Sequence, residues 1–198
     1  MTRRSIFLTG TSSRHGRRCR SFPPPDVSAV SIVLISVCIL IDADFPLDIG
    51  VSNFAIKNLE KLLNDPSCKT VPAVNQVELH PNNPSPKLIE YCKSKGIHAT
   101  AYSCLGSTNS PLAKDQTLQK IADAEGKSTA QVLLKWGLQR DTSVIPKSVT
   151  ASRIQGNFQL DGWSLNDDEM KQLSSLPDRF KVCGDGWLPV RVFIDDAE

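Results

Sequence analysis

Downstream of residue 47, short apolar stretches alternate with longer stretches in which apolar residues recur at every third or fourth position. The short stretches are typical of strands in a buried parallel sheet, and the longer ones of helices with one buried face. This pattern predicts strands over 48–52, 72–79, 97–103 and 143–146. It predicts helices over 55–63, 86–95, 116–125, 128–140, 150–155 and 166–176.

Residues with known preferences mark several of the predicted helix ends. Ser128 with Gln131, and Asn166 with Glu169, have the spacing of a capping box, in which two side chains bind backbone N–H groups of the first turn. Gly96 follows the second predicted helix, at a position where a left-handed residue commonly ends a helix.

Each predicted strand is followed by one or two predicted helices. Repeated βα units form a parallel sheet with helices outside it, because parallel neighbours need a crossover connection. Doubly wound sheets and TIM barrels both satisfy this rule. No G-x-G-x-x-G sequence follows any predicted strand, which disfavours the dinucleotide-binding doubly wound fold.

Residues 1–47 differ in character from the rest of the chain. Six arginines but no acidic residue precede Asp26, and a proline triplet leads into an apolar run from Val27 to Ile41. This run is shorter than the roughly 20 residues that a spanning helix needs. Three explanations remain: a targeting segment, a buried strand rich in Val and Ile, or a segment foreign to the natural product. The composition favours the last two.

Composition narrows the class of protein. Hydrophobic residues make up 40% of the 198 residues and charged residues 22%, which predicts a mostly globular chain. The formal net charge of +2 gives little support for a nucleic-acid or membrane-surface partner. None of the six cysteines belongs to a C-x-x-C pair or lies near clustered histidines, which argues against a zinc site or a redox dithiol. We therefore expect a reducing, cytoplasmic setting.

Polar residues gather where the predicted strands end. Functional residues of barrels lie at the carboxyl ends of the strands. The candidates there are Ser52, Asn53, Asn75, Gln76, Glu78, His80, Tyr102, Ser103, Leu105, Gly106, Ser107, Lys147, Ser148 and Arg153.

Taken singly, these candidates have structural explanations. Ser52 and Asn53 can cap the next helix. Asn75 or Gln76 can serve a buried hydrogen-bond network. His80 can be a turn residue, and Tyr102 can belong to the core. Lys147 and Arg153 can be solvated surface charges.

Taken together, the candidates match the parts of a nicotinamide nucleotide. Ser, Asn and Gln supply the acceptor and the donors that a carboxamide needs. Tyr102 offers a ring for stacking, and a glycine-containing loop lets N–H groups approach a pyrophosphate. A helix start beside Lys147, Ser148 and Arg153 favours a phosphate dianion such as the 2′-phosphate of NADP.

Four motifs resemble those of the aldo-keto reductases in order and spacing. They are DIGVSNF (48–54), VPAVNQVELHP (71–81), TAYSCLGS (100–107) and IPKSVTASRIQGNFQL (145–160). The resemblance extends from about residue 49 to the C terminus, and the segment 161–165 with the tail is similar to fungal members near the glycerol dehydrogenase branch. It implies a (β/α)8 barrel that binds NADP(H) and reduces aldehydes or ketones to alcohols.

Carried over by position, the resemblance implies a role for each candidate. Ser52, Asn53 and Gln76 would hold the carboxamide, and Tyr102 would stack on the nicotinamide. The remaining contacts run toward the adenine end of the cofactor: Ser103, Leu105 and Ser107 at the pyrophosphate, Lys147, Ser148 and Arg153 at the 2′-phosphate, and Asn157 at the adenine. The tail around Trp187 would help to wall the substrate pocket.

Two departures from the family pattern matter. Gly156 stands where many members carry a glutamate that helps to hold the adenine end. The family's general acid is a tyrosine, assisted by a lysine, an aspartate and a histidine from the first half of the barrel. The residues before Ile49 contain no tyrosine and no lysine, and the only tyrosines are Tyr91 and Tyr102. We therefore assign no catalytic residue and expect the chain to be inactive alone, with a non-catalytic NADP-binding module as the alternative.

The predicted architecture is a partial barrel. Residues 48–198 would form roughly the last four βα units of an aldo-keto reductase, and residues 1–47 an unmatched segment. Half of an eight-stranded barrel leaves an unpaired edge on each terminal strand, which favours self-association. The segment from Val30 to Ile41 is a candidate fifth strand over one of these edges.

Overall fold

The structure is a computed structural model that describes residues 49–107 and 110–184. Within them, one sheet is built from four strands: β1 (Gly50–Ser52), β2 (Val74–Glu78), β3 (His98–Tyr102) and β4 (Ser143–Val144). All four predicted strands are present, each shorter than predicted. The expected start of the first strand at Asp48 and the candidate strand from Val30 to Ile41 lie outside the described residues.

The sheet is parallel throughout, and each strand pairs with the strand that precedes it in the chain. Ser52 is paired with Gln76, and Glu78 with Tyr102, so the carboxyl ends of β1, β2 and β3 meet at one edge. This sequential parallel order, with helices in the crossovers, is the arrangement of a partial (β/α)8 barrel. The prediction of the fold class is confirmed.

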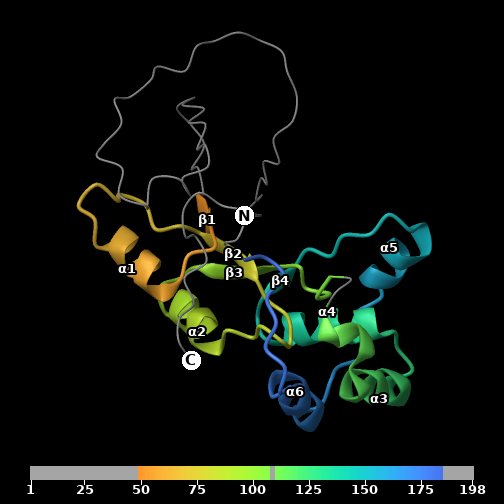
Figure 1. Cartoon of the computed structure of the whole chain (residues 1–198). Helices are drawn as coiled ribbons and strands as arrows, with labels where there is room; N and C mark the ends of the chain where they lie inside the picture. The colour runs from red at the N-terminus through yellow and green to blue at the C-terminus, as the bar shows by residue number, and fades with distance from the viewer. Residues whose placement is uncertain (1–48, 108–109, 185–198) are drawn as a thin grey trace.

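Six α-helices and one short 3₁₀ helix connect or follow the described strands (Figure 1). They are α1 (Ile56–Leu63), α2 (Pro86–Ser94), η1 (Pro111–Lys114), α3 (Gln116–Glu125), α4 (Thr129–Gln139), α5 (Ala151–Phe158) and α6 (Asp167–Ser174). The 3₁₀ helix was not predicted, although Ser110 and Pro111 form a start signal. The Ser110 side chain accepts a hydrogen bond from the Leu112 N–H.

Both predicted capping boxes are formed, at the starts of α4 and α6. Ser128 Oγ accepts the Gln131 N–H while Gln131 Oε1 accepts the Ser128 N–H. Asn166 and Glu169 make the same reciprocal pair at the start of α6. Gly96 has φ +72° just beyond α2, which confirms it as the left-handed stop.

Two clusters of buried side chains form the core. The first lies between the sheet and helices α1 and α2, and includes Leu59, Val77 and Leu88. The second joins α3, α4 and α6. Its largest member, Trp136, is 2% exposed and donates its ring N–H to Ser174 Oγ at 3.0 Å. Fully burying one leucine or valine side chain stabilises a fold by about 1.5–3 kcal/mol, so both clusters contribute substantially.

Helix α5 stands apart from this core (Figure 1). It has no buried residue, and Val149 and Phe158 beside it are 84% and 83% exposed. Its last turn is held by Gln131 of α4, whose side-chain N–H groups bind the carbonyls of Gly156 and Gln159, both at 3.2 Å. The helix was predicted to end at Gln155 and runs on to Phe158.

Among the described residues, no helix has both the length and the apolar character needed to cross a membrane.

Candidate functional site

The predicted carboxamide residues form one hydrogen-bonded cluster at the carboxyl ends of β1, β2 and β3. The Tyr102 hydroxyl donates to Asn53 Oδ1 at 2.9 Å. The Ser52 hydroxyl and the Asn53 N–H both donate to the backbone carbonyl of Gln76, at 2.9 and 3.0 Å. Three strands are therefore tied together by the residues that the sequence singled out.

The backbone turns sharply where two of these strands end. Asn53 follows β1 with φ +60°, and Ser103 follows β3 with φ +49°. Non-glycine residues rarely adopt this left-handed conformation, and those that do are concentrated at functional sites. The structural explanation that Ser52 or Asn53 caps α1 is wrong, because Ala55 occupies the cap position and no side chain binds there.

The neighbouring amides of Asn75 and Gln76 have different surroundings. Asn75 is fully buried, and its amide binds the backbone N–H and carbonyl of Phe54 at 3.4 and 2.8 Å. It is also within 3.8 Å of Cys92 Sγ on α2, so it points toward the helices. Successive side chains on a strand alternate, so Gln76 points to the opposite face. The Gln76 side-chain amide is half-buried and has no hydrogen-bond partner within the part of the chain that the structure describes.

The loop after β3 is tightly turned. The Gly106 N–H donates to the Ser103 carbonyl at 2.7 Å, so this N–H is occupied within the loop itself. Gly106 has φ +76°, and a Cβ there would lie 2.6 Å from Ser110 Oγ. Leu105 is half-buried, whereas Ser107 is exposed with φ +63°. The predicted pyrophosphate residues therefore lie in a tight turn that directly follows Tyr102.

The predicted phosphate residues lie on a second, separate surface. Lys147 and Arg153 are exposed and form no salt bridge within the described ranges. Ser148 Oγ accepts the Thr150 N–H at 3.2 Å just ahead of α5. The cap position of α5, Thr150, makes no side-chain hydrogen bond, so the N–H groups of its first turn are open. Exposed cations beside an open helix start form an environment that favours a phosphate.

The structure thus places the predicted carboxamide and stacking residues in one group and the predicted phosphate and adenine residues in another. Ser52, Asn53, Gln76 and Tyr102 lie together, while Lys147, Ser148, Arg153 and Asn157 lie on α5 and the loop before it. No hydrogen bond or ion pair joins the two groups in residues 49–107 and 110–184.

One functional-looking contact escaped the sequence analysis. The Glu78 carboxylate, 3% exposed at the end of β2, accepts N–H groups from Val182 and Cys183 at 2.5 and 2.8 Å. His80 Nε2 lies 3.0 Å from the same carboxylate. His80 and Asn83 form an antiparallel bridge around a turn, which agrees with the expected turn role of His80. The signal in the sequence was an acidic residue at the end of a predicted buried strand, but nothing there indicated its distant partners.

Burial and the groups around Tyr102 keep its hydroxyl protonated. Burial raises the pKa of Tyr102 strongly, and the neighbouring Cys183 thiol and Glu78 carboxylate raise it further. The hydrogen bond to Asn53 acts in the opposite direction but does not outweigh them. Burial likewise raises the pKa of Cys183. At neutral pH, Tyr102 is therefore an uncharged aromatic group with a donor hydroxyl.

The described cysteines and acids form no metal centre. Among the described residues, no disulfide bond involves Cys68, Cys92, Cys104 or Cys183, and no group of His, Cys, Asp and Glu side chains has the arrangement of a metal site. Cys92 and Cys104 are buried, as expected for isolated cysteines, and burial raises the pKa of Cys104 to about 11.

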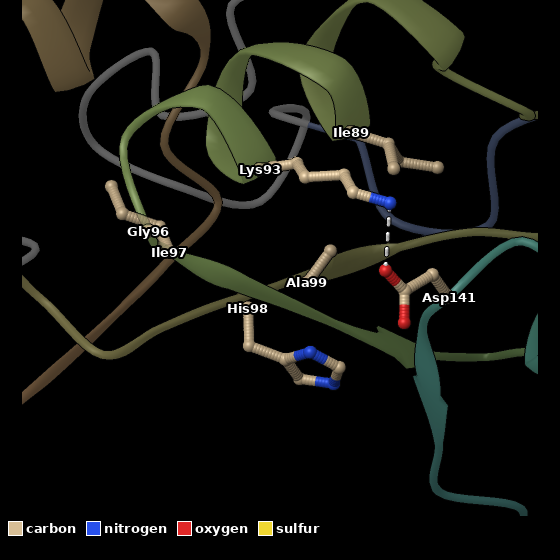
Figure 2. A pocket seen from close by; sticks show the side chains of 7 residues that line it. All are labelled: Ile89, Lys93, Gly96, Ile97, His98, Ala99 and Asp141. Atoms are coloured by element: carbon tan, nitrogen blue, oxygen red, sulfur yellow. Dashed lines mark hydrogen bonds and ion pairs between the residues drawn. The ribbon is translucent and has the colours of Figure 1, made fainter.

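A shallow pocket of about 200 Å³ lies away from the carboxyl ends of the strands (Figure 2). It is at the opposite, amino end of β3 and is lined by Ile89, Lys93, Gly96, Ile97, His98, Ala99 and Asp141. Lys93 and Asp141 form an ion pair across it at 3.0 Å, but both side chains are at least 70% exposed. An exposed pair of this kind contributes about 0–1 kcal/mol, and we assign it no role in binding.

A family model describing the aldo/keto reductase family matches residues 47–178, well over half of the chain. The chain belongs to this family. The match spans β1 to α6, so it contains both groups of predicted site residues.

Individual relatives agree with this placement. The chain is 44% identical over 128 residues to aldehyde reductase YPR1 of Saccharomyces cerevisiae, covering 65% of this chain and 40% of that protein. It is 42% identical over 146 residues to glycerol 2-dehydrogenase (NADP(+)) of the same yeast, covering 73% of this chain and 47% of that protein. D-galacturonate reductase of Hypocrea jecorina is 46% identical over 126 residues, covering 64% and 40%.

A solved structure shares the fold. The aldose reductase of Schistosoma japonicum superposes with a TM-score of 0.63 at 38% identity, covering 69% of this chain and 43% of that chain. The chain therefore spans less than half the length of the relatives that it matches.

Proposed function

We propose that this chain binds NADPH along the carboxyl ends of its strands, as the cofactor-binding half of an aldo/keto reductase. In this proposal, Ser52, Asn53 and Gln76 hold the carboxamide and Tyr102 stacks on the nicotinamide. The observation that carries the proposal is the Tyr102–Asn53 hydrogen bond at 2.9 Å between two strand ends, beside left-handed backbone.

The residues present fit the nicotinamide end of the cofactor. A carboxamide needs an acceptor and donors, and the Gln76 amide is half-buried on the face away from α2 with no partner among the described residues. Tyr102 offers an uncharged ring and holds Asn53 in place through its hydroxyl. The site is therefore preorganised for a planar amide-bearing ring.

The phosphate end of the proposed site determines the choice of NADP over NAD. Lys147 and Arg153 lie on either side of the open start of α5, with Ser148 between them in the chain. The 2′-phosphate is the group that distinguishes NADP, and it is a dianion near neutral pH. Two cations and free N–H groups favour it through charge and hydrogen bonding. Ser103, Leu105 and Ser107 lie between the two ends as pyrophosphate contacts, and Asn157 in the last turn of α5 is the proposed adenine contact.

We propose that turnover needs residues beyond these 198. When bound, NADPH supplies the hydride for reduction of an aldehyde or a ketone to an alcohol. A general acid must give a proton to the carbonyl oxygen, and Tyr102 does not suit this task. Its hydroxyl already donates to Asn53, and its raised pKa makes it a weak proton donor. Tyr91, the other tyrosine, lies on helix α2.

The alternative is a non-catalytic NADP-binding module, and it uses the same contacts. The two hypotheses differ in whether NADPH is consumed when the chain is supplied with the first half of a related reductase. The isolated cysteines of the sequence, none of them in a C-x-x-C pair, support a cytoplasmic setting. The two yeast relatives together with the Hypocrea relative support a fungal-like member.

The test of the proposed site compares NADPH with NADH by calorimetric titration. Lys147→Ala and Arg153→Ala are each expected to weaken NADPH binding by about 1 kcal/mol, or roughly fivefold, because each removes an exposed charge from the phosphate. NADH binding should not change. Lys120→Ala on α3 removes the same charge from another exposed position and is the control. Equal losses for NADPH and NADH, or a loss with Lys120→Ala, would contradict the assignment.

A further inference from the structure

The tail after α6 returns to the region just after β2 and is fastened there by Asn82 and Glu78. Asn82 Nδ2 donates to the Asp178 carbonyl at 2.9 Å, and the Phe180 N–H donates to the backbone carbonyl of Asn82 at 3.2 Å. Further along, the N–H groups of Val182 and Cys183 donate to Glu78. We call residues 178–183 the tail segment.

Glu78 is an unusual residue for its position. It is the acid at the end of β2, whose other residues are two valines and two amides, and only 3% of it is exposed. Burying a carboxylate is unfavourable unless donors surround it. Burial alone would raise its pKa, but the His80 ring and the two tail N–H groups outweigh burial and hold the pKa below the ordinary value. The carboxylate therefore stays charged and uses both oxygens on the tail.

If Glu78 and His80 only stabilised the core, Glu78 would not need hydrogen bonds from the tail segment. His80 would satisfy one oxygen of Glu78 from within the same turn. Instead, Val182 binds Oε1, the oxygen that His80 also binds, and Cys183 binds Oε2. The N–H groups of Val182 and Cys183, more than 100 residues away in the sequence, therefore help to stabilise the buried Glu78 carboxylate.

The tail segment ends against the proposed nicotinamide site. Glu78 is paired in register with Tyr102 across β2 and β3. Cys183 lies close enough to the Tyr102 hydroxyl to influence its ionisation, as does Glu78. The same hydroxyl holds Asn53. The anchoring carboxylate, the end of the tail segment and the Tyr102–Asn53 pair therefore form one contiguous group.

We propose that Glu78 is a positioning residue that fastens the tail segment over the nicotinamide end of the site, so that release of the tail and exchange of the cofactor are coupled. This inference rests on the proposed function, in which Tyr102 receives the nicotinamide. With the anchor in place, the tail restricts departure of NADPH. Without it, the cofactor leaves faster.

The test uses the full chain and two independent ways of breaking the anchor. Glu78→Gln keeps the size of the side chain but replaces one acceptor oxygen with an NH₂ group. Val182→Pro removes one donor from the tail and leaves β2 untouched, so it remains informative if Glu78→Gln does not fold. Glu169→Ala is the control, because it breaks a hydrogen bond with Asn166 at the start of α6, and Glu169 forms no hydrogen bond with the tail segment in the described part of the chain.

Two readouts separate anchoring from cofactor exchange. The first is the alkylation rate of Cys183, followed by peptide mass spectrometry, and the second is NADPH dissociation measured by stopped-flow fluorescence. Loss of a charge-assisted hydrogen bond corresponds to about a tenfold change, so we expect both rates to rise about tenfold in Glu78→Gln and Val182→Pro. Bound NADPH should in turn slow Cys183 alkylation in the unmodified chain, because coupling is reciprocal. Glu169→Ala should leave both rates unchanged.

Three results would contradict the proposed coupling, and each points to a different step of it. If the variants expose Cys183 but NADPH leaves at the same rate, the tail does not control exchange, and the proposed cofactor site stands. If neither variant speeds Cys183 alkylation, Glu78 does not anchor the tail. If the unmodified chain binds no NADPH, the proposed function fails first, and the coupling fails with it.

Discussion

Tyr102 and Asn53 show how much a single hydrogen bond organises at this site. The two residues are 49 positions apart in the chain, yet the hydroxyl of one meets the side-chain oxygen of the other at 2.9 Å. The bond joins the first strand of the sheet to the third across the end of β2. Since Asn53 holds a left-handed conformation, the bond also helps to fix a backbone turn that is otherwise unfavourable.

Removing only the hydroxyl of Tyr102 separates its two roles. Tyr102→Phe keeps the ring but leaves Asn53 Oδ1 without its donor, which should lower the free energy of unfolding by about 0.5–1.5 kcal/mol. Urea denaturation measures this loss. NADPH should still bind, because the stacking surface remains. Tyr102→Ala is the comparison, and it should lose NADPH binding as well as stability.

If Tyr102→Phe bound NADPH as poorly as Tyr102→Ala, the ring would not be the binding element. The hydroxyl would then be the group on which the cofactor depends.

Glu78 makes stability depend on pH in the acid range. Its pKa in the folded chain is lowered, so it contributes stability above its unfolded pKa of about 4.3. This contribution is lost as the pH falls through the lower, folded value. We expect the free energy of unfolding to drop more steeply below about pH 4 in the original chain than in Glu78→Gln.

Urea denaturation between pH 6 and pH 3 checks this expectation. The groups that face Glu78 are His80 and the tail N–H groups, together with Tyr102 and Cys183. The last two have raised pKa values and do not titrate in this range. Parallel pH profiles for the two proteins would show that Glu78 does not carry the effect.

At the scale of elements, the apolar pattern and local chemistry predicted most of the fold. The helix expected over 116–125 coincides with α3, and both predicted capping boxes are formed. The last strand is shorter than predicted because its hydrogen bonding to β3 stops at Pro146, which has no N–H to donate. The last such bond runs from the Ile145 N–H to the Ala101 carbonyl. Such ends depend on single backbone groups rather than on periodicity.

Contacts between distant segments could not be predicted in the same way. The sequence marked the strand-end residues because their positions follow from the βα pattern and the family motifs. Nothing local marked the binding of Val182 by Glu78, which spans 104 positions. Likewise, α5 runs past Gly156 to Phe158, where Gln131 of another helix binds the carbonyls of the last turn.

Gly156 gives a test of how α5 is stabilised. A Cβ built at this position meets nothing within 4 Å, and glycine inside a helix is about 0.5–1 kcal/mol less favourable than alanine. Gly156→Ala should therefore stabilise α5 by about that amount. Hydrogen exchange of the α5 amides measures the change directly, since the helix has no buried residue and can open locally.

Gly106→Ala is the matched comparison. Its φ of +76° and the 2.6 Å approach to Ser110 Oγ leave no room for the same methyl group. This substitution should destabilise the loop after β3. Equal effects of the two substitutions would mean that local backbone geometry does not govern either position.

At the scale of the whole molecule, the sheet has two terminal strands with a partner on one side only among the described residues. β1 pairs with β2 and β4 with β3, whereas strands of a closed barrel have neighbours on both sides. Several large apolar side chains near β4 and α5 are also exposed, including Ile145, Val149 and Phe158. Such a surface favours association with another chain.

We therefore expect the purified chain to self-associate as its concentration rises. Phe158→Glu combined with Val149→Glu should reduce association, because charges are costly to bury at an interface. Sedimentation velocity over a range of concentrations measures it. Val71→Glu is the control, since Val71 is also exposed, at 52%, but lies ahead of β2 rather than beside α5. A monomer at every concentration would contradict the expectation.

We propose that these residues form the NADP-binding half of an aldo/keto reductase and hold the cofactor by themselves. Titration of the purified 198-residue chain with NADPH, followed through the fluorescence of the nicotinamide, tests it most directly. We expect saturable binding that is weaker with NADH, and no consumption of NADPH when an aldehyde is added. Absence of saturable binding would contradict the cofactor site, and steady oxidation of NADPH would contradict the assignment of catalysis to residues outside the chain.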